Sequence, residues 1–400
     1  MQLPFTSSKS ILCYDSVTPQ LCSLILLNHQ RGTEPNRGQD CSSDTDMNSK
    51  LRAEVSPHAG YGGLALNPQG AHCAMNILVT GAAGYVGSVC AAELAKQGNH
   101  VVAYDNLSAG HRQAVVERVH FVKGDIADTE KLRRVSKKHH IEAVMHFAAS
   151  ALVEESVGNP RLYYSNNVSG TISLLEVMVS LKIQRLIFSS SAAVYGEPKS
   201  VPIREDHPTN PVNPYGETKL VIERALAWYH QAYGIRSAAL RYFNAAGAAP
   251  ELGEDHRPET HLLPRLFAAA SRSEAGFEIY GDDYPTPDGT CVRDFVHVLD
   301  IAQAHIRALH SLSRLGLKIF NVGNGKGYSI RAAVKVVEEV TGRKLNVHVG
   351  GRRPGDPAVL VATARKLRRE LNWEPRHSDL KSIIQSAWAW MQRHPKGYRD

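Results

Sequence analysis

The sequence predicts an α/β fold in which a doubly wound parallel sheet is followed by a smaller C-terminal α/β domain. Three observations lead to this prediction. Short apolar runs alternate with helical patterns from residue 75 to about residue 250, and this is the order of a parallel sheet covered by helices on both faces. A glycine-rich loop directly follows the first apolar run. Beyond Pro250 the alternation loosens into loops rich in proline, glycine and aspartate, with shorter helices between them.

The apolar runs are short and nearly continuous, which is typical of strands buried on both faces. We expect strands at Asn76–Thr80, His100–Tyr104, Val119–Lys123, Ile141–Ala148, Gln184–Ser190 and Arg236–Tyr242. Helical periodicity predicts helices at Tyr85–Gln97, Pro160–Leu181 and Pro214–Tyr233. In the C-terminal part it predicts helices at Asp300–Leu312, Ser329–Thr341, Ala364–Asn372 and Asp379–Arg393. Trp388 and Trp390, in the last of these, are interpreted as packing residues.

Composition and length divide the 400 residues into three parts. With 43% hydrophobic and 21% charged residues, the whole chain has an ordinary globular composition. Residues 1–74 are rich in Ser, Asn, Gly, Pro and Gln and show no sustained period, so we interpret them as a disordered extension or as a start assigned upstream of Met75. The remaining expectation is a dinucleotide-binding domain at 75–250 and a substrate domain at 251–400, with part of 290–320 packing on the first domain.

The charge and cysteine content exclude several classes of protein. The net charge is +7 and its Lys and Arg residues are spread along the chain, which argues against a nucleic-acid partner. No run of 18 apolar residues is present, so no membrane span is expected. Outside the first 74 residues only Cys90 and Cys291 occur, without metal-ligand spacing. We therefore expect no metal, no disulfide framework and a cytoplasmic location.

The glycine loop and an acidic residue indicate a dinucleotide site. Gly81, Gly84 and Gly87 span the loop after the first strand and the first turn of the helix that follows, where free backbone N–H groups and the helix dipole attract a pyrophosphate. Asp105 ends the second strand, where a carboxylate accepts hydrogen bonds from ribose hydroxyls and repels a 2′-phosphate. This favours NAD over NADP. Asp125, in the turn after the third strand, is either an adenine contact or an ordinary turn or helix-capping residue.

A serine, a tyrosine and a lysine are the candidate catalytic set. Ser191 follows the fifth strand, and Tyr215 and Lys219 lie four residues apart on one helix, so their side chains share a face. A free tyrosine has a pKa of about 10. A nearby ammonium and a nicotinamide cation would stabilise its phenolate and make it a base. Ser191 would then bridge the substrate hydroxyl and Tyr215.

These motifs together resemble the extended short-chain dehydrogenase/reductase family and, within it, the UDP-glucose 4-epimerases. The resemblance covers nearly all of residues 75–400. Its segments are MNILVTGAAGYVGS, YDNLSAGH, GDIAD, HFAAS, YYSNNVSGT, FSSSAAVYGEP, NPYGETK, RYFNAAGA, GDDYPTPDGTCVRDFVHV, FNVGNG and RRPGDPA. The resemblance implies an NAD-binding Rossmann-type domain, a smaller UDP-sugar domain and a homodimer.

The resemblance also assigns roles to individual residues. The implied cofactor contacts are Gly81, Gly84, Gly87, Tyr85, Val86, Asp105, Asn106, Asp125, Ile126, Phe147, Ala148, Tyr215 and Lys219. The implied substrate contacts are Ser191, Tyr215, Asn244, Arg293, Arg353 and Asp356. Both arginines would grip the diphosphate, because a guanidinium donates paired hydrogen bonds to phosphate oxygens. One of Asn166 and Asn167 would have a structural or cofactor-side role, and the sequence does not say which.

The implied reaction interconverts UDP-glucose and UDP-galactose through a 4-keto sugar, with transient reduction of bound NAD. Epimerisation of UDP-GlcNAc/UDP-GalNAc, a UDP-pentose or a UDP-uronate is the alternative. A 4,6-dehydratase would need an acid next to Ser191, where Ala192 and Ala193 stand. Loss of the tyrosine or lysine would indicate a non-catalytic NAD sensor, yet both are present. Two departures from the family pattern matter: Ala151 stands where some members have a lysine that bonds the cofactor ribose, and Leu360 stands where some members have a tyrosine beside the sugar.

Overall fold

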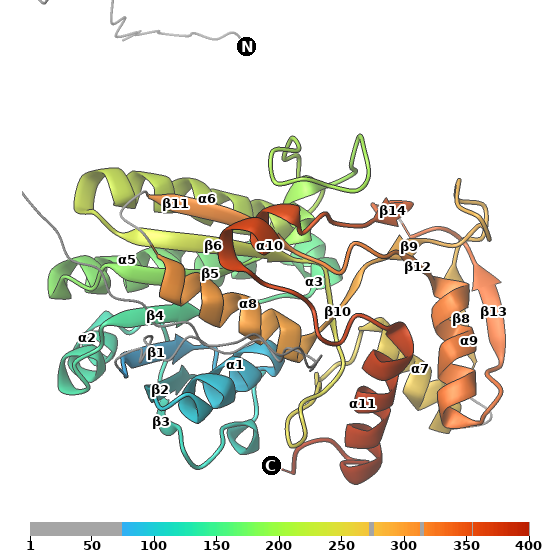
Figure 1. Cartoon of the computed structure of the whole chain (residues 1–400), viewed down its shortest axis with the longest axis horizontal. Helices are drawn as coiled ribbons and strands as arrows, with labels where there is room; N and C mark the ends of the chain where they lie inside the picture. Colours follow the sequence, from blue (N-terminus) through green and yellow to red (C-terminus); the bar gives the residue numbers. More distant parts are fainter. Residues whose placement is uncertain (1–73, 272–275, 313–315, 354, 400) are drawn as a thin grey trace, which may run out of the picture. The chain divides into compact units, whose positions relative to one another are not determined.

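The computed structural model describes residues 74–271, 276–312, 316–353 and 355–399, and the expectations for residues 1–73 lie outside this part. A seven-stranded sheet with the order β11-β6-β5-β4-β1-β2-β3 forms its centre (Figure 1). Every neighbouring pair of strands in it is parallel. The chain runs outward from β1 through β2 to β3, and then from β4 in the opposite direction. The predicted doubly wound sheet is therefore confirmed, with its switch point between β1 and β4.

Six of the seven strands lie where the apolar runs predicted them. The strands are β1 (Asn76–Thr80), β2 (His100–Asp105), β3 (His120–Lys123), β4 (Ala143–His146), β5 (Arg185–Ser191), β6 (Arg236–Tyr242) and β11 (Leu317–Val322). The seventh, β11, was not predicted. It pairs with β6 over its whole length, although the two are far apart in the sequence.

The helices cover both faces of this sheet. They are α1 (Tyr85–Lys96), α2 (Thr129–Lys138), α3 (Val153–Gly158), α4 (Pro160–Tyr163), α5 (Gly170–Leu181), α6 (Pro214–Tyr233), α8 (Val298–Ser311) and α10 (Arg365–Leu371). The single helix predicted at 160–181 contains six residues of π-helix (η2, Tyr164–Ser169) between α4 and α5. Such widened turns in helices are often found at functional sites.

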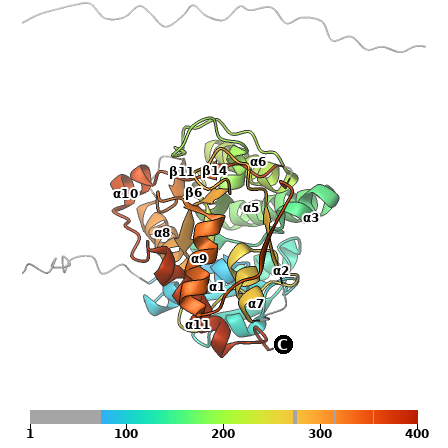
Figure 2. The same ribbon diagram turned by 90° about the vertical axis from the view of Figure 1, so that its right-hand side faces the viewer.

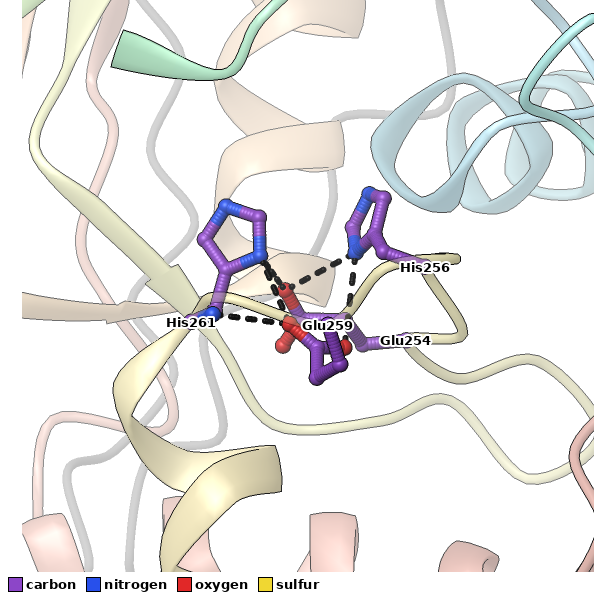
Figure 3. A group of neighbouring side chains, drawn as sticks. All are labelled: Glu254, His256, Glu259 and His261. Carbon is purple, nitrogen blue, oxygen red and sulfur yellow. Dashed lines mark hydrogen bonds and ion pairs between the residues drawn. The ribbon is translucent and has the colours of Figure 1, made fainter. Parts of the chain in front are cut away.

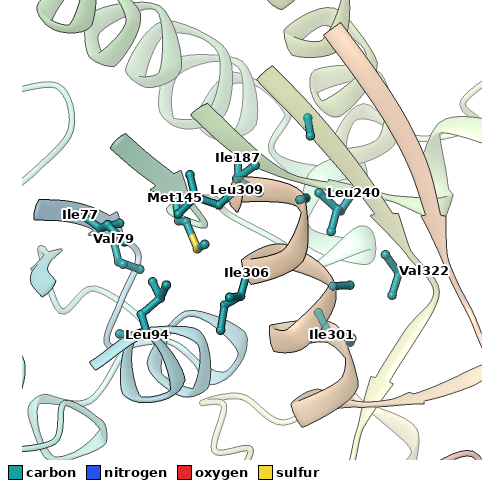
Figure 4. Packing of buried hydrophobic residues seen from close by; sticks show 14 of the residues in the cluster. Ile77, Val79, Leu94, Met145, Ile187, Leu240, Ile301, Ile306, Leu309 and Val322 are labelled. Atoms are coloured by element: carbon teal, nitrogen blue, oxygen red, sulfur yellow. The ribbon is translucent and has the colours of Figure 1, made fainter. Parts of the chain in front are cut away.

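Alternation along the central strands divides the core into two layers. Ile77 and Val79 of β1 face α1 and α8, and Leu78 between them faces α2, α5 and α6. Figure 4 shows α8 lying along the first of these layers, with Leu309 next to Met145 and Ile187 and with Ile306 on the side of α1. Helix α8 and strand β11 thus belong to the sheet layers, although they follow residues of the second region.

The second region is built from short elements. Its helices and longer strands are α7 (Leu262–Ser271), β8 (Phe277–Tyr280), α9 (Ile330–Thr341), β13 (Val347–Gly350) and α11 (Leu380–Arg393). β8 pairs with β13 in parallel, and α7, α9 and α11 enclose a separate apolar cluster (Figure 2). The four helices predicted in the C-terminal part are all present, with ends within two residues of those expected. α7 was not predicted.

Very short strands connect the two regions. β7 (Asn244–Ala246) pairs with β10 (Phe295–His297), and β9 (Val292–Arg293) lies between β12 (Tyr328–Ser329) and β14 (Val359–Leu360). These pairings bring together segments that are separated by up to 70 residues or so in sequence, directly beyond the carboxyl end of β6. Among the described residues, no helix has both the length and the apolar character needed to cross a membrane.

Candidate active site

The predicted site residues gather at the carboxyl edge of the large sheet. Gly81 follows β1, Asp105 ends β2 and Ser191 ends β5. Ser191 is paired in register with Tyr242, the last residue of β6, and Asn244 begins β7 two residues later. In a parallel sheet all the carboxyl ends lie at one edge, and ligands bind there next to the switch point. The fold thus joins the candidate cofactor and substrate residues at one place.

Two of the three loop glycines are required by packing within the protein. Gly81 has a φ of +70°, and a Cβ there would lie 2.4 Å from the backbone nitrogen of Ala148. A Cβ on Gly87 would lie 2.1 Å from the carbonyl oxygen of Gly81. Gly84 is different, because a Cβ there would meet only the Gly81 carbonyl oxygen, at 3.4 Å. Gly84 therefore leaves its backbone open to a ligand.

Gly84 is also the N-cap of α1, and this helix start has no protein cap. No side chain accepts a hydrogen bond from the first turn, and the first turn contains no acidic residue. Helices α2, α6, α9 and α11 instead begin with capping side chains from Asp128, Asn213, Ser329 and Asp379. The free N–H groups of α1 suit a phosphate. This part of the chain fits the pyrophosphate of a dinucleotide.

Asp105 holds the loop in shape from the neighbouring strand. Its carboxylate accepts hydrogen bonds from the backbone N–H of Ala83, at 2.9 Å, and of Leu107, at 2.8 Å. Burial raises the pKa of Asp105, and these two hydrogen bonds oppose that rise. Asp105 thus supports the glycine loop itself, in addition to the ribose contact predicted for it.

Asp125 occupies the turn after β3. Its carboxylate accepts hydrogen bonds from Asn106 Nδ2 and from the backbone N–H of Ala127, both at 2.8 Å. The N-cap of α2 is Asp128 and not Asp125. Of the two interpretations left open by the sequence, the turn role is present in the structure, and it also orients Asn106. The adenine contact stays a prediction.

The other predicted cofactor residues line the same edge. The Tyr85 hydroxyl donates to the carbonyl of Gly247 at 2.5 Å, which ties the start of α1 to the loop after β7. The Phe147 backbone N–H donates to Thr80, and Ala148 abuts Gly81. Ile126 is buried and Val86 is half-buried. All five residues therefore border the glycine loop or the adjoining β3–α2 turn.

Ser191, Tyr215 and Lys219 converge as predicted. Tyr215 and Lys219 lie on α6 and are 8% and 3% exposed. The Lys219 ammonium donates to the carbonyl of Ser189 at 2.9 Å and lies 5.7 Å from the centre of the Tyr215 ring. The Ser191 hydroxyl accepts a hydrogen bond from the Ala193 N–H and interacts with Tyr215. The serine, the phenol and the ammonium thus form one buried group.

The protein environment of this group favours the phenol form of Tyr215. Burial raises the pKa of Tyr215 above its ordinary value, and the hydrogen bond with Ser191 offsets this only in part. Burial lowers the pKa of Lys219 to about 7, against the opposing charge of Glu223. The protein by itself therefore keeps Tyr215 as a phenol at neutral pH. Additional positive charge near the phenol is needed to make it a base.

The four candidate substrate residues lie together beyond β6. Arg293 is buried, and its guanidinium donates to the carbonyl of Pro357 at 2.8 Å and to the Asp356 carboxylate at 3.0 Å. The Asn244 N–H donates to Asp294, next to Arg293. Arg353 is exposed, with its guanidinium 4.3 Å from the centre of the Tyr280 ring. The predicted arginine and ribose acid are thus directly paired, which orients both.

Comparison with known proteins agrees with this arrangement. Residues 77–323 match the model of the NAD dependent epimerase/dehydratase family. The chain belongs to this family. It is 49% identical over 329 residues to UDP-glucose 4-epimerase of Lactobacillus helveticus, a match that covers 82% of the chain and all of the relative.

Solved structures of the same family superpose on the chain. A crystal structure of UDP-glucose 4-epimerase has a TM-score of 0.79 at 47% identity, and the match covers 81% of this chain and 99% of the other. The UDP-glucose 4-epimerase of Brucella ovis, solved in complex with NAD, has a TM-score of 0.76 at 49% identity, covering 79% and 98%. NAD is the cofactor of this epimerase/dehydratase family member, and the uncapped start of α1 fits it.

Sequence reasoning missed a buried ion pair behind the catalytic group of this family member. Glu223 lies one turn after Lys219 on α6, and its carboxylate accepts hydrogen bonds from Arg241 Nε at 2.9 Å and from the Ser190 hydroxyl at 2.6 Å. Arg241 also donates to the Tyr195 hydroxyl at 2.9 Å. The spacing of four residues from Lys219 was the available signal, since it places a carboxylate on the same helix face.

The structure distinguishes between Asn166 and Asn167. Asn167 is buried and exchanges hydrogen bonds with both backbone groups of Ser150, and its Nδ2 also donates to Thr218 on α6. Asn166 donates from its side chain to the Ser150 hydroxyl. Asn167 therefore has the structural role, because it connects the loop after β4 to the helix that carries Tyr215 and Lys219.

The two departures from the family pattern also have defined positions. Ala151 is exposed, directly after the loop that Asn167 holds. Leu360 is half-buried on β14, in register with Arg293, and packs against an apolar cluster that includes Ala192 and Phe243. Leu360 thus lies between the candidate diphosphate arginine and the turn after Ser191.

Proposed function

We propose that the protein is an NAD-dependent enzyme that interconverts UDP-glucose and UDP-galactose by inverting C4 of the sugar. The observation that carries the proposal is the buried Ser191, Tyr215 and Lys219 group at the same sheet edge as the uncapped α1. The names and the near-complete coverage of relatives 46–49% identical to the chain support it.

The base is Tyr215, which removes the proton of the sugar C4 hydroxyl directly or through Ser191. When bound, NAD would supply a positively charged ring beside the phenol and the group that exchanges a hydride with C4. Lys219 in its ammonium form stabilises the phenolate. Ser189 orients this lysine through its carbonyl oxygen, so the ammonium is directed to the side of the sheet edge where the phenol lies.

The diphosphate is anchored while the sugar turns. Arg293 and Arg353 bind its oxygens, Asp356 contacts the uridine ribose and Asn244 binds on the phosphate or uridine side. Arg293 is suited to a fixed anchor, because Asp356 and two backbone carbonyls already hold its guanidinium. Arg353 lies exposed over Tyr280 and can move toward the ligand. A fixed diphosphate lets the 4-keto sugar present its opposite face without leaving.

The cofactor is held by groups along the first half of the sheet edge. Gly84 and the first turn of α1, including Tyr85 and Val86, bind the pyrophosphate, with Gly81 and Gly87 allowing the close packing of the loop. Asp105 and Asn106 bind the adenosine ribose, and Asp125 and Ile126 border the adenine. Phe147, Ala148, Tyr215 and Lys219 border the nicotinamide ribose. Residues 75–250 then form the NAD domain, and 251–400 the UDP-sugar domain, with α8 and β11 returning to the first.

Epimerisation of UDP-GlcNAc and UDP-GalNAc is a second candidate activity. Leu360 is smaller than the tyrosine of other family members, and it lies between Arg293 and the turn after Ser191. A smaller side chain at that place leaves room for an acetamido group at C2. We expect Leu360→Tyr to lower kcat/KM for UDP-GalNAc about tenfold more than for UDP-galactose, because the larger ring excludes only the bulkier substituent. Equal losses for both substrates would contradict this role.

We propose a homodimer as the active form. Large apolar side chains are exposed together on the α3–α4–η2 segment, namely Val153, Val157, Leu162 and Tyr164. Helix α6 contacts α3 and α4. Trp228, on α6, is also exposed. A second copy would cover this apolar surface. Light scattering during gel filtration should give twice the mass of one chain, and Val157→Glu should shift it to one chain.

The deciding experiment supplies purified protein with UDP-galactose and no added cofactor, followed by assay for UDP-glucose. Turnover without added NAD shows that the enzyme retains its cofactor. Turnover only with added NAD still supports the interconversion of UDP-galactose and UDP-glucose. It also indicates the weaker cofactor binding expected from Ala151. No conversion of UDP-galactose under either condition overturns it, and UDP-GalNAc, UDP-pentoses and UDP-galacturonate are then the substrates to assay.

A further inference from the structure

A group of four metal-binding side chains lies outside the catalytic site, in the loop between β7 and α7. Glu254, His256, Glu259 and His261 each direct one ligand atom to a common point, and these four atoms all lie within 4.8 Å of one another (Figure 3). The spacing is E-x-H-x2-E-x-H. We propose that these four residues bind a divalent transition-metal ion, with Zn²⁺ as the expected metal.

The distances suit such an ion. His261 Nδ1 lies 3.0 Å from Glu259 Oε1 and 3.2 Å from Glu254 Oε1. His256 Nδ1 lies 3.4 Å from Glu254 Oε1 and 3.7 Å from Glu259 Oε2. Ligand atoms about 2.0–2.2 Å from a tetrahedral zinc ion are roughly 3.3–3.6 Å apart. The four distances, which involve both oxygens of Glu259, run from 3.0 to 3.7 Å and span this range, so a zinc ion requires only that the flexible side chains draw closer together.

One nitrogen of the group lacks a hydrogen bond. His256 Nδ1 is shielded from solvent and has no hydrogen-bond partner in the described part of the chain, although both glutamates lie at ion-pair distance. Buried polar atoms of this kind are rare and call for a specific explanation. A cation between the rings and the carboxylates would satisfy this nitrogen and neutralise both glutamates together.

Hydrogen bonds to the C-terminal residues fix the backbone of the loop that carries the four side chains. Asp255, between Glu254 and His256, points elsewhere and accepts a hydrogen bond from the Tyr398 N–H at 2.9 Å. Tyr398 in turn bonds the backbone N–H of Gly253 through its hydroxyl, at 3.1 Å. The C-terminal residues thus fix the backbone on both sides of Glu254. The ring of His256 packs edge-on against Tyr85 of α1, with 6.5 Å between the ring centres.

The donor set identifies the class of metal. Two imidazoles and two carboxylates suit zinc and its neighbours in the first transition row better than Mg²⁺ or Ca²⁺, which prefer oxygen ligands alone. Four protein ligands leave no open position, so the ion would be structural and not catalytic. It would fasten the start of α7 to Tyr85 at the glycine loop. This proposal does not depend on the sugar substrate.

The expectation of no metal rests on the two cysteines and on the lack of CxxC or Cys/His spacing, and it does not consider histidines together with carboxylates. The competing explanation is that both imidazoles are protonated and balance the two carboxylates as ion pairs. That arrangement binds no metal. Titration with zinc therefore distinguishes the two explanations.

The test uses the full-length chain without a histidine tag. After treatment with a chelator and its removal, zinc is added back against a competing chromophoric chelator, and bound metal is counted by mass spectrometry. We expect one zinc ion per chain and a melting temperature that rises with added zinc. His256→Gln and Glu259→Gln should each weaken zinc binding at least about 100-fold, because each removes a direct ligand.

His139→Gln is the matched control, since His139 pairs with His120 at 4.7 Å between ring centres but has no place in the cluster. It should bind zinc as the unaltered chain does. Melting temperatures in chelator show whether each variant folds, and His261→Asn provides a third ligand change if one does not. Less than one-tenth of an ion per chain, or equal affinity in the ligand variants, overturns the proposal. A failure of epimerase activity has no bearing on this result.

Discussion

The helices α1 and α6 both begin at the functional edge of the sheet, but their first turns differ. α6 starts with Pro214, and the Asn213 side chain caps it by accepting a hydrogen bond from the Gly216 N–H at 2.9 Å. α1 starts at Gly84 with no side-chain cap and no acid in its first turn. Its N–H groups are left for another partner.

The two helix N-termini therefore have different roles in the molecule. The capped α6 is a fixed support for Tyr215, Lys219 and Glu223, which lie on one face in successive turns. The uncapped α1 is a binding surface that stays incomplete until an anion is present. Changes in α6 should therefore alter chemistry or stability, whereas a change at Gly84 should alter cofactor binding without unfolding the protein.

The largest effect is expected for the base on α6. Tyr215→Phe removes the phenol oxygen that is hydrogen-bonded to Ser191 and should lower kcat about 10³-fold, as for other lost acid–base groups. Tyr233→Phe, at the exposed end of the same helix, is the control and should keep normal activity. Both are measured as conversion of UDP-galactose. A variant at Tyr215 with more than one-tenth of the original kcat would exclude it as the base.

Alanine substitutions at Gly81 and Gly84 should affect different properties, the first protein stability and the second NAD binding. Gly81→Ala forces a positive φ on alanine and places its Cβ against Ala148, so it should lower the free energy of unfolding by about 2–4 kcal/mol. Gly84→Ala has room for its Cβ and should change stability by less than ~1 kcal/mol. It should nevertheless weaken NAD binding about tenfold, because the methyl group obstructs the approach of the pyrophosphate.

Urea unfolding and the absorbance of retained cofactor measure these two properties separately. If Gly84→Ala loses stability but keeps its NAD, the open start of α1 is a packing feature and not a cofactor site.

Glu223→Gln should change the pH dependence of the reaction. Burial lowers the pKa of Lys219 to about 7, and the Glu223 carboxylate opposes that lowering. Without the carboxylate the pKa of Lys219 falls further, so the ammonium is lost at a lower pH. The alkaline decline of kcat/KM should therefore move to lower pH. Glu176→Gln, at an exposed position of α5, should leave the profile unchanged.

The smallest effect is expected for the cap of α6. Asn213→Ala removes the hydrogen bond to Gly216 and should lower the free energy of unfolding by ~1 kcal/mol. Asp379→Ala, at the equivalent place on α11, should cause a similar loss. Only the first should also reduce kcat, by about twofold, since α6 carries the base. Equal kcat in both variants would show that the α6 cap contributes stability alone.

Local sequence signals predicted one half of the molecule better than the other. The strands from β1 to β6 are continuous apolar runs next to recognisable turns, and the catalytic spacing on α6 is local to one helix. β11 is different, because it is an edge strand that pairs with β6, which ends about 75 residues earlier, and no local signal predicts that pairing. α7 follows the loop that carries Glu254, His256, Glu259 and His261.

Dependence on tertiary packing also explains why some contacts and one protonation state in the site were not predicted from the sequence. The Arg293–Asp356 contact depends on β9 pairing with β14, strands of two residues each. The Glu223–Arg241 pair joins a helix to a strand. The pKa of Tyr215 depends on how deeply α6 packs, which no spacing reveals. Contacts made through tertiary packing leave no periodic trace in the chain.

The late arrival of β11 affects how the protein is made. As the chain leaves the ribosome, β6 is complete at Tyr242, yet its outer neighbour begins only at Leu317. At roughly 5–20 residues per second, β6 waits several seconds with one edge unpaired. During that interval α8, which covers the same layer of the core, is also absent. The large sheet therefore cannot be completed until β11 has been synthesised, after the short strands that follow β6.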